Sequence, residues 1–279
     1  KKEGYDMKYY VIGNPINHSL SPILQNVLMK NHGIDASYTR RLVKTEELGA
    51  FFEELRREGG GCNITLPHKS EAVKYMDECE EDAVKANSVN TVVAREGRLY
   101  GASTDAPGFV LSAESNGIKF KDKRVTIYGS GGVSAPIAMM LAREGAHVSI
   151  AGRTAERVAR ACELSGAEYA GSNLSAAVRG CDVFINTTSL GMAGTGTQFA
   201  NFRFLRSLEQ GAVVIDLIYT PRPTELLKRA AEMGFRTMDG LAMLFWQGAL
   251  SFEKWFGIKA VQEDCDEAMS AMLEQLAKR

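Results

Sequence analysis

Short β-rich runs alternate with amphipathic helical patterns along most of the chain, and this alternation constrains the fold more than any other feature of the sequence. In the N-terminal part, β-rich runs at 8–13, 36–43 and 60–65 are each followed by a helical pattern. Such a succession is typical of an α/β protein, in which helices cover the faces of a sheet. With 279 residues, the chain is long enough for two domains of ordinary size.

The segment 45–58 shows the helical pattern most clearly. Its large apolar residues recur at spacings of three and four, with charged residues between them: Leu48, Phe51, Phe52 and Leu55. This spacing predicts a helix with one buried face, ended by the glycines at 59–61. Two further helices are predicted, one from Pro22 and one that begins after Pro67.

Two β-rich runs, at 88–94 and 98–103, flank Glu96 and Gly97, a pair that favours a tight turn. They predict an antiparallel hairpin, so the first sheet is expected to mix parallel and antiparallel strands. The composition then changes at about 107–122, where we expect a break between domains.

A second α/β series begins at Lys123 and continues to Asp239. Its strands are apolar almost throughout, as expected where helices cover both faces of a parallel sheet. After Asp239 the chain is predicted to be helical to its end, and we expect this segment to pack on the first domain. The predicted fold class is α/β, with an N-terminal mixed-sheet domain (1–106 and 243–279) and a parallel-sheet domain (107–242).

A phosphate-binding motif opens the second domain. It lies between a predicted strand and a predicted helix and consists of Gly129, Ser130, Gly131, Gly132 and Val133. In this arrangement, backbone N–H groups and the positive end of the helix dipole face the pyrophosphate of a dinucleotide. The motif indicates a Rossmann-type domain, with a plain glycine turn as the alternative because the third position of the usual pattern is Ser134.

The end of the next strand favours NADP over NAD as the cofactor. An NAD-binding domain normally carries an acidic residue there for the ribose 2′-hydroxyl, and this sequence has none. Instead, Arg153, Thr154 and Arg157 offer two guanidinium groups and a hydroxyl to a 2′-phosphate. The alternative is that both arginines are ordinary solvated residues, but a basic first turn opposes the helix dipole unless an anion is bound.

Polar clusters in the first domain indicate a substrate site. Ser19 and Ser21 place two hydroxyls just before a helix and suit a carboxylate, while Ser21 also fits a helix N-cap. Lys69 is predicted in a first helical turn, where its charge is unfavourable unless the ammonium has a function. If Lys69 and Asp105 meet, they form a pair suited to proton transfer; a helix N-cap is the alternative role for Asp105.

Composition argues against several other classes of protein. Lys and Arg total 33 against 34 Asp and Glu, and this formal charge of −1 argues against nucleic-acid binding. No apolar run suggests a membrane span or a signal peptide. The five cysteines are scattered and contain no Cys-x-x-Cys pair, so we expect a cytoplasmic protein without disulfides. His18 and His68, which lie beside the polar clusters, have no acidic or cysteine partner at ligand spacing, and no metal is expected.

A series of motifs between residues 10 and 257 resembles the shikimate dehydrogenase family. In order, they are HSLSP (18–22), NITLPHK (63–69), SVNT (88–91), STD (103–105), GSGG (129–132), GRTAER (152–157), NTTSLGM (186–192), DLIYTPRPT (216–224) and GLAMLFWQGALSFEKWFG (240–257). One such motif would be weak evidence, but this many in the family's order are specific.

The resemblance implies an enzyme of aromatic amino-acid and chorismate biosynthesis that interconverts 3-dehydroshikimate and shikimate with NADP. It implies that Lys69 and Asp105 are the catalytic pair, and that the active-site cleft lies between the two domains. The implied substrate-binding residues are Ser19, Ser21, Asn63, Thr65, Asn90, Tyr219 and Gln247. The implied cofactor-binding residues are Gly129, Ser130, Gly131, Gly132, Val133, Arg153, Thr154, Arg157, Thr188, Ser189, Leu217, Gly240 and Met243.

Some positions depart from the common family pattern. Gln25 and Ser103 replace a frequent histidine and the usual asparagine, while Ser130 and Val133 replace alanines of the glycine loop. Gly152 replaces an asparagine before the first arginine, which removes a hydrogen bond to the ribose or the adenine. The strength of the preference for NADP over NAD therefore stays open.

Two other functions stay open. A related dehydrogenase of quinate or of an amino-substituted shikimate would use the same groups, because the serine pair suits any of these carboxylates. A catalytically silent NADP-binding sensor is less favoured, because both Lys69 and Asp105 are present. The sequence also leaves open whether the protein is a monomer or a homodimer, and whether the six residues before Met7 are native, left from cloning or part of a longer polypeptide.

Overall fold

The structure is a computed structural model that describes residues 7–278. The six residues before Met7, whose origin the sequence leaves open, lie outside the described residues. The chain divides into two compact units, Lys1–Gly108 with Leu244–Arg279 and Phe109–Met243. The sequence predicts boundaries after residues 106 and 242, whereas the units divide after Gly108 and Met243.

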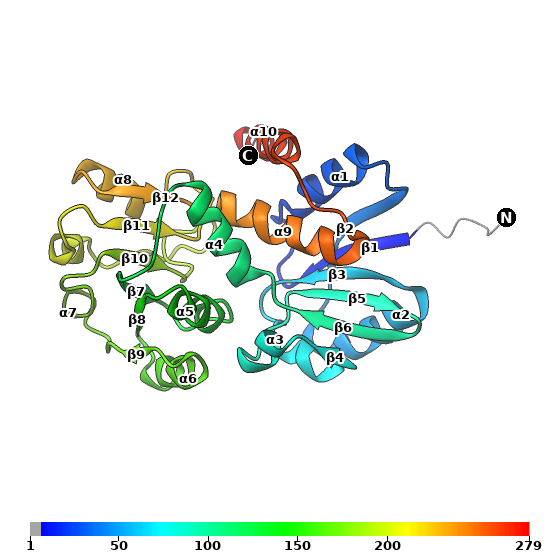
Figure 1. Cartoon of the computed structure of the whole chain (residues 1–279), viewed down its shortest axis with the longest axis horizontal. Coiled ribbons are helices and arrows are strands. Elements are labelled where there is room, and N and C mark those ends of the chain that lie inside the picture. The colour runs from blue at the N-terminus through cyan, green and yellow to red at the C-terminus, as the bar shows by residue number, and fades with distance from the viewer. Residues whose placement is uncertain (1–6, 279) are drawn as a thin grey trace. The chain divides into compact units, whose positions relative to one another are not determined.

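The first unit is built on a mixed sheet with the strand order β2-β1-β3-β5-β6-β4 (Figure 1). Its strands are β1 (Met7–Gly13), β2 (Ala36–Leu42), β3 (Gly60–Ile64), β4 (Glu78–Cys79), β5 (Thr91–Arg95) and β6 (Arg98–Ala102). β1 pairs in parallel with β2 and β3, whereas β5 runs antiparallel to β3 and β6. The predicted hairpin and the predicted mixed sheet are both confirmed.

Helices cover both faces of this sheet, with α1 and α9 on one face and α2 on the other (Figure 1). The helices of this part are α1 (Ser21–Asn31), α2 (Leu48–Glu58), α3 (Glu81–Lys85), α9 (Leu241–Phe256) and α10 (Gln262–Ala277), with short 3-10 helices η1 (Thr45–Glu47) and η2 (Glu71–Tyr75). The C-terminal segment packs on the first unit: the indole N–H of Trp255 donates to the carbonyl oxygen of Val92 at 2.9 Å. No helix among residues 7–278 is both long and apolar enough to cross a membrane.

Side chains along β3 alternate between an apolar face and a polar face. Cys62 and Ile64 are buried in the apolar cluster that contains Phe51 and Phe52 of α2. The four apolar residues predicted for the buried face of α2 are all buried, each stabilising the fold by about 1.5–3 kcal/mol. Asn63 instead donates to the hydroxyl of Ser251 in α9 at 2.9 Å. Cys62 therefore points away from the polar cluster, as predicted.

The second unit is built on a parallel sheet with the order β12-β11-β10-β7-β8-β9, and α5 and α6 lie on one face with α8 on the other (Figure 1). Its strands are β7 (Arg124–Tyr128), β8 (His147–Ala151), β9 (Glu168–Tyr169), β10 (Val183–Asn186), β11 (Val213–Asp216) and β12 (Arg236–Met238). Its helices are α5 (Ser134–Arg143), α6 (Ala155–Ser165), α7 (Leu174–Ala177) and α8 (Glu225–Glu232), with the 3-10 helix η3 (Arg203–Ser207). The predicted Rossmann-type parallel sheet is confirmed.

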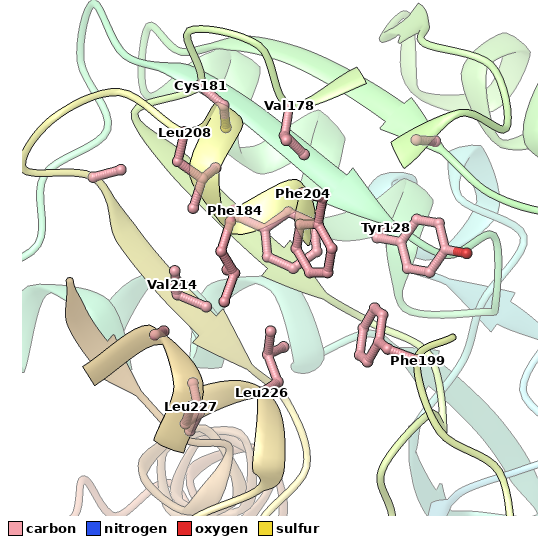
Figure 2. Close-up of a cluster of buried hydrophobic side chains, with 14 of the residues drawn as sticks. Tyr128, Val178, Cys181, Phe184, Phe199, Phe204, Leu208, Val214, Leu226 and Leu227 are labelled. Atoms are coloured by element: carbon pink, nitrogen blue, oxygen red, sulfur yellow. The ribbon is translucent and has the colours of Figure 1, made fainter. Parts of the chain in front are cut away.

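Aromatic side chains fill the core that includes residues of β10, η3 and α8. Figure 2 shows the rings of Phe184 and Phe204 lying against each other, with Tyr128 and Phe199 to one side. The ring centroids of Phe184 and Phe204 are 5.1 Å apart, and those of Tyr128 and Phe199 are 5.8 Å apart. Each such pair adds about 0.5–1.5 kcal/mol beyond its buried area. Because Tyr128 is the last residue of β7, this core holds the strand end from which the glycine loop starts.

The two units divide after Gly108, within the segment where the change in composition predicts a break between domains, and a helix runs through this point. This helix, α4 (Asp105–Ser115), runs through Pro107 and Gly108. Pro107 is its third residue, where a missing N–H costs no intrahelical hydrogen bond. Phe109 and Ala113, one turn apart, are fully buried and supply the packing that outweighs the poor local propensity.

Two local predictions near the candidate site are wrong. The segment after Pro67 forms only the short 3-10 helix η2 from Glu71, so Lys69 lies in the preceding turn and the helix-dipole argument does not apply to it. Ser21 is the first residue of α1 and not its N-cap, because Leu20 takes that position without a side-chain cap. The helix predicted over 45–58 is confirmed, because the 3-10 helix η1 leads directly into α2, which ends at Glu58 with Gly59 as its C-cap.

Candidate functional site

Lys69 and Asp105 form an ion pair in the first unit. The Lys69 Nζ atom lies 2.6 Å from Asp105 Oδ2, and the two side chains are only 15% and 7% exposed. The carbonyl oxygen of Lys69 accepts from the N–H of Val89, one residue before Asn90. The Asn90 side chain accepts from the N–H of Thr104, one residue before Asp105. Asn90 thus links the two segments that carry the pair.

A buried polar network surrounds Asn90. Its side-chain oxygen accepts from Thr91 and Thr104, while its amide donates to the Thr104 hydroxyl at 2.9 Å and reaches Gln247 at 3.4 Å. The Thr104 hydroxyl is therefore used in this network. The structure brings Asn90 and Gln247 together, as the resemblance implies.

The side-chain amide of Asn63 forms its hydrogen bonds with other protein groups. Its side-chain oxygen accepts from the Tyr38 hydroxyl at 2.7 Å, and its amide contacts the hydroxyls of Thr91 and Ser251. Tyr38 is fully buried, and burial raises its pKa well above 10. With these partners Asn63 orients the network, which leaves little hydrogen-bonding capacity for a ligand.

Tyr38 and Ser251 are functional candidates that the sequence reasoning missed. The Ser251 hydroxyl contacts Thr91 at 2.8 Å and donates to the carbonyl oxygen of Gln247 at 2.9 Å. One signal was present, because Ser251 follows Gln247 by four residues and so lies on the same helix face. Tyr38 carried no signal, since an aromatic residue in a strand is ordinary core composition.

Close packing against α4 fixes the backbone position of Gln247. Gly108 of α4 lies against the backbone of Gln247, so that an added Cβ would come within 2.6 Å of the Gln247 nitrogen. On the next residue, the Gly248 carbonyl oxygen accepts from the buried amide of Gln25 at 2.8 Å. Gln25, where the family often has histidine, thus holds α1 against α9.

The serine pair lies at the start of α1. The hydroxyls of Ser19 and Ser21 are 3.2 Å apart, and the N–H of Ser21 donates to the Ser19 hydroxyl at 3.3 Å. Thr65, half-buried after β3, donates its N–H to the carbonyl oxygen of Ile12 at 2.9 Å. The side chains of these three residues remain suited to a ligand with several oxygens.

The glycine loop joins β7 to α5 in the second unit. Gly129 has a φ of +131°, and Ser130, Gly131, Gly132 and Val133 follow it before α5 begins at Ser134. Val133 is the N-cap and makes no side-chain cap. The buried Ser134 hydroxyl lies 2.9 Å from that of Thr187, which ties the helix start to the end of β10. Within the first turn of α5, the N–H of Ser134 donates to the carbonyl oxygen of Gly131 at 3.0 Å and Pro136 has no N–H. The positive end of the α5 dipole still favours an anion at the glycine loop.

Replacing Gly129 with Ala is expected to destabilise the second unit. The positive φ disfavours a side chain, and an added Cβ would collide with the hydroxyl of Thr187. Gly131→Ala is the matched variant, because no heavy atom lies within 4 Å of its added Cβ. Thermal unfolding should show a lower melting temperature for Gly129→Ala and an unchanged one for Gly131→Ala. Equal melting temperatures for both variants would contradict this role of Gly129.

The cationic cluster follows β8. Arg153, Thr154 and Arg157 are exposed, and Thr154 is the N-cap of α6 but makes no side-chain cap. Within residues 7–278, neither guanidinium group has a carboxylate partner. Burial raises the pKa of Tyr128, and the nearby charge of Arg153 partly offsets this. The cluster is therefore an unneutralised positive surface beside the end of β7.

The other predicted cofactor residues gather at the carboxyl ends of β10 and β11. Asn186 accepts from the N–H and the hydroxyl of Thr188, at 3.1 and 2.7 Å, and its carbonyl accepts from the N–H of Leu217. Gly240 lies directly against Leu217, whose carbonyl oxygen leaves no room for a Cβ there. Ser189 is exposed and Met243 is buried in α9. Tyr219 lies two residues beyond Leu217, half-buried, in the second unit.

Asp216, which no prediction included, is buried beneath these residues. Its carboxylate accepts from the amide of Asn186 at 2.9 Å and from the hydroxyl of Thr224 at 2.7 Å. Burial raises its pKa from 3.8 to about 6, with the charge of Asp239 adding to the rise and the hydrogen bonds opposing it. Since the folded protein binds this proton more tightly, the resulting stability is complete below pH 4 and is lost as the pH rises through 6.

The Asp216→Asn variant is expected to unfold with a free energy that no longer falls between pH 4 and 6. The asparagine oxygen can still accept from Asn186, while its amide donates to the Thr224 hydroxyl. The effect at pH 7 is a gain of about 1–3 kcal/mol. Urea denaturation at both pH values measures it, with the exposed Asp122→Asn as the control. A pH dependence that is unchanged in Asp216→Asn would contradict this role.

Residues 7–278 contain no group of three or more His, Cys, Asp or Glu placed to hold a metal ion. Cys62, Cys79, Cys162, Cys181 and Cys265 are all free thiols. The described residues offer two candidate ligand sites: the polar cluster in the first unit and the glycine loop with its cationic neighbours in the second.

Comparison with known protein families matches nearly the whole chain. Residues 11–92 match the shikimate dehydrogenase substrate binding domain, residues 111–242 match shikimate / quinate 5-dehydrogenase, and residues 240–269 match the shikimate 5′-dehydrogenase C-terminal domain. These three segments contain Lys69, the glycine loop and Gln247, respectively.

Individual relatives agree with the family match. The chain is 39% identical to the NADP(+) shikimate dehydrogenase of Pyrococcus abyssi over 275 residues, covering 98% of this chain and 100% of that protein. The structure of Thermus thermophilus shikimate 5-dehydrogenase in complex with NADP(H) and shikimate has a TM-score of 0.87 at 31% identity, covering 95% and 99% of the two chains. The ligand-free 5-ketofructose reductase of Gluconobacter sp. strain CHM43 has a TM-score of 0.81 at 28% identity, covering 98% of each chain. With the family match across both units, these similarities show that the chain belongs to the shikimate dehydrogenase family.

Proposed function

We propose that this protein is an NADP-dependent dehydrogenase that interconverts 3-dehydroshikimate and shikimate in the biosynthesis of aromatic amino acids. The observation that carries this proposal is the Lys69–Asp105 ion pair, held at 2.6 Å beside a buried network of hydrogen-bonding groups. An ion pair that only stabilises the surface of a protein would not need a buried network of hydrogen-bonding groups beside it. NADPH, when bound, would supply the hydride that reduces the C3 carbonyl carbon of the substrate.

Lys69 supplies the proton that this reduction needs. As the carbonyl carbon gains a hydride, its oxygen gains negative charge and takes a proton from the Lys69 ammonium, giving the C3 hydroxyl of shikimate. Asp105 holds the ammonium in place through their contact. In the oxidation direction, the neutral amine of Lys69 removes the hydroxyl proton as the hydride leaves.

The remaining residues bind and orient the ligands. Ser19 and Ser21 bind the substrate carboxylate, while Thr65, Asn90 and Gln247 face the ring hydroxyls. Tyr219 of the second unit is a further substrate-binding residue. Asn63 contributes by orienting this network, since its own side chain is occupied. The glycine loop binds the pyrophosphate, the cationic cluster binds the 2′-phosphate, and Thr188, Ser189, Leu217, Gly240 and Met243 line the remainder of the cofactor site.

The first experiment is an assay of NADPH formation by the purified protein with shikimate, beside quinate and an amino-substituted shikimate, and with NAD in place of NADP. Rapid turnover with shikimate and NADP alone supports the proposal. Turnover with quinate or the amino analogue would instead support the related dehydrogenase. Tight NADP binding without turnover would support the sensor.

We further propose that the protein acts in the cytoplasm with small-molecule ligands and without nucleic-acid or membrane partners. The free thiols of all five cysteines support a reducing compartment. The assembly is a monomer or a homodimer, and sedimentation velocity distinguishes the two.

A further inference from the structure

Arg40 of β2 makes two hydrogen bonds to the backbone of Ser19, the first residue of the serine pair. Its Nε and Nη2 atoms both donate to the carbonyl oxygen of Ser19, at 2.9 and 2.6 Å. The N–H of Ser19 donates to the carbonyl oxygen of Ile16, so both backbone polar groups of this residue are fixed. The backbone of Ser19 is therefore fixed in position, and its hydroxyl contacts that of Ser21.

The charge of Arg40 is not neutralised by a neighbouring acid. Within residues 7–278, no carboxylate lies within salt-bridge distance of its guanidinium. The next residue, Arg41, differs in this respect, because it binds both carboxylate oxygens of Glu54 at 2.6 and 2.7 Å. Adjacent strand residues point to opposite faces, so the two arginines serve different neighbours.

Arg40 favours binding of an anion at the serine pair in two ways. Hydrogen bonds from a guanidinium hold the loop that presents the hydroxyls, and its positive charge contacts the backbone of the residue that carries the first of them. Two serine hydroxyls carry no charge, and because each is both donor and acceptor they can bind the hydroxyls of a neutral sugar as well as a carboxylate. The same fold is found in a 5-ketofructose reductase, named for a sugar without a carboxylate. Selection of a carboxylate therefore requires a group beyond the fold.

We propose that Arg40 is a specificity-determining residue that makes the serine pair selective for a carboxylate. This inference rests on the proposed function, because it takes the serine pair as the subsite for the acid group of the substrate. Arg40 acts by positioning Ser19 and by adding charge, not by taking part in proton or hydride transfer. It should therefore affect substrate binding and leave the chemical step unchanged.

The test compares Arg40→Gln and Arg40→Lys with Arg41→Gln as the matched control. Arg40→Gln is expected to raise the KM for shikimate about tenfold with kcat and the KM for NADP within about twofold of wild type. Arg40→Lys keeps the charge but loses the two-pronged contact, and should recover part of the loss. The methyl ester of shikimate should be discriminated against by wild type and much less by Arg40→Gln. Raising the salt concentration should weaken shikimate binding more in wild type than in Arg40→Gln.

The outcomes separate this inference from the proposed function. If wild type turns over shikimate and Arg40→Gln has the same KM and the same ester discrimination, the role of Arg40 is overturned and the proposed function stands. A rise in KM that is equally large in Arg41→Gln would also overturn it. If wild type binds shikimate without turnover, calorimetric dissociation constants replace KM and decide the role of Arg40. If wild type neither binds nor turns over shikimate, both proposals fall.

Discussion

Replacing Lys69 with Met is expected to lower kcat by about 10²–10⁴-fold, the usual loss for a general acid or base, with little change in the KM for shikimate. Methionine keeps the approximate length of the side chain but has no proton to give to the carbonyl oxygen. Steady-state kinetics in both directions would measure the loss. Lys74→Met is the matched control, because Lys74 is exposed on η2 in the same segment and pairs only with its neighbours. A kcat close to that of wild type would remove Lys69 from the proton transfer.

A second variant separates lost chemistry from lost stability. Lys69→Met leaves the Asp105 carboxylate buried without its partner, which for a buried pair costs about 3–5 kcal/mol. The double variant Lys69→Met with Asp105→Asn removes both charges and should recover most of the melting temperature. Its kcat should stay as low as that of the single variant. Recovery of kcat together with stability would show that the ion pair is structural.

Sequence reasoning predicted the parts of this molecule that depend on local pattern. The apolar face of α2, the hairpin of β5 and β6, and the glycine turn before α5 each follow from spacing or turn chemistry within a few residues. The polar clusters suggested Lys69 and Asp105 as a possible pair, the family resemblance implied that they are catalytic, and the structure brings them into contact. Residues 69 and 105 are far apart in the sequence, so no local pattern could have shown this.

The missed features depend on tertiary contacts. The units divide after Gly108, within the segment of the predicted domain break, but that segment begins with a helix because burial of the residues after Gly108 stabilises α4. Gly108 also lets this helix approach Gln247. Lys69 lies in a turn because η2 begins only at Glu71. Tyr38 and Ser251 acquire their place by meeting Asn63 from different elements. Arg40 resembles its neighbour Arg41 in the sequence, and only the contact with Ser19 distinguishes them.

Replacing both Arg153 and Arg157 with Ser is expected to lower kcat/KM with NADP by about 10²–10³-fold and to leave kcat/KM with NAD nearly unchanged. Each arginine would form a charge-assisted hydrogen bond with the 2′-phosphate, worth about 1.5–3 kcal/mol before solvent screening. NAD lacks this phosphate, so it loses no contact. Both side chains are exposed, and the melting temperature should hardly change.

Arg160→Ser provides the control for this cofactor selectivity, because Arg160 lies on the same helix, is exposed and pairs with Glu163. It should leave both cofactors unaffected, since its charge is already neutralised. The two single variants then show whether Arg153 or Arg157 contributes more to the preference for NADP over NAD. This matters because Gly152, which precedes Arg153, has no side chain that could contact the ribose. An equal loss with NADP and NAD in the double variant would mean that the cationic cluster supports the fold of the cofactor site and does not read the 2′-phosphate.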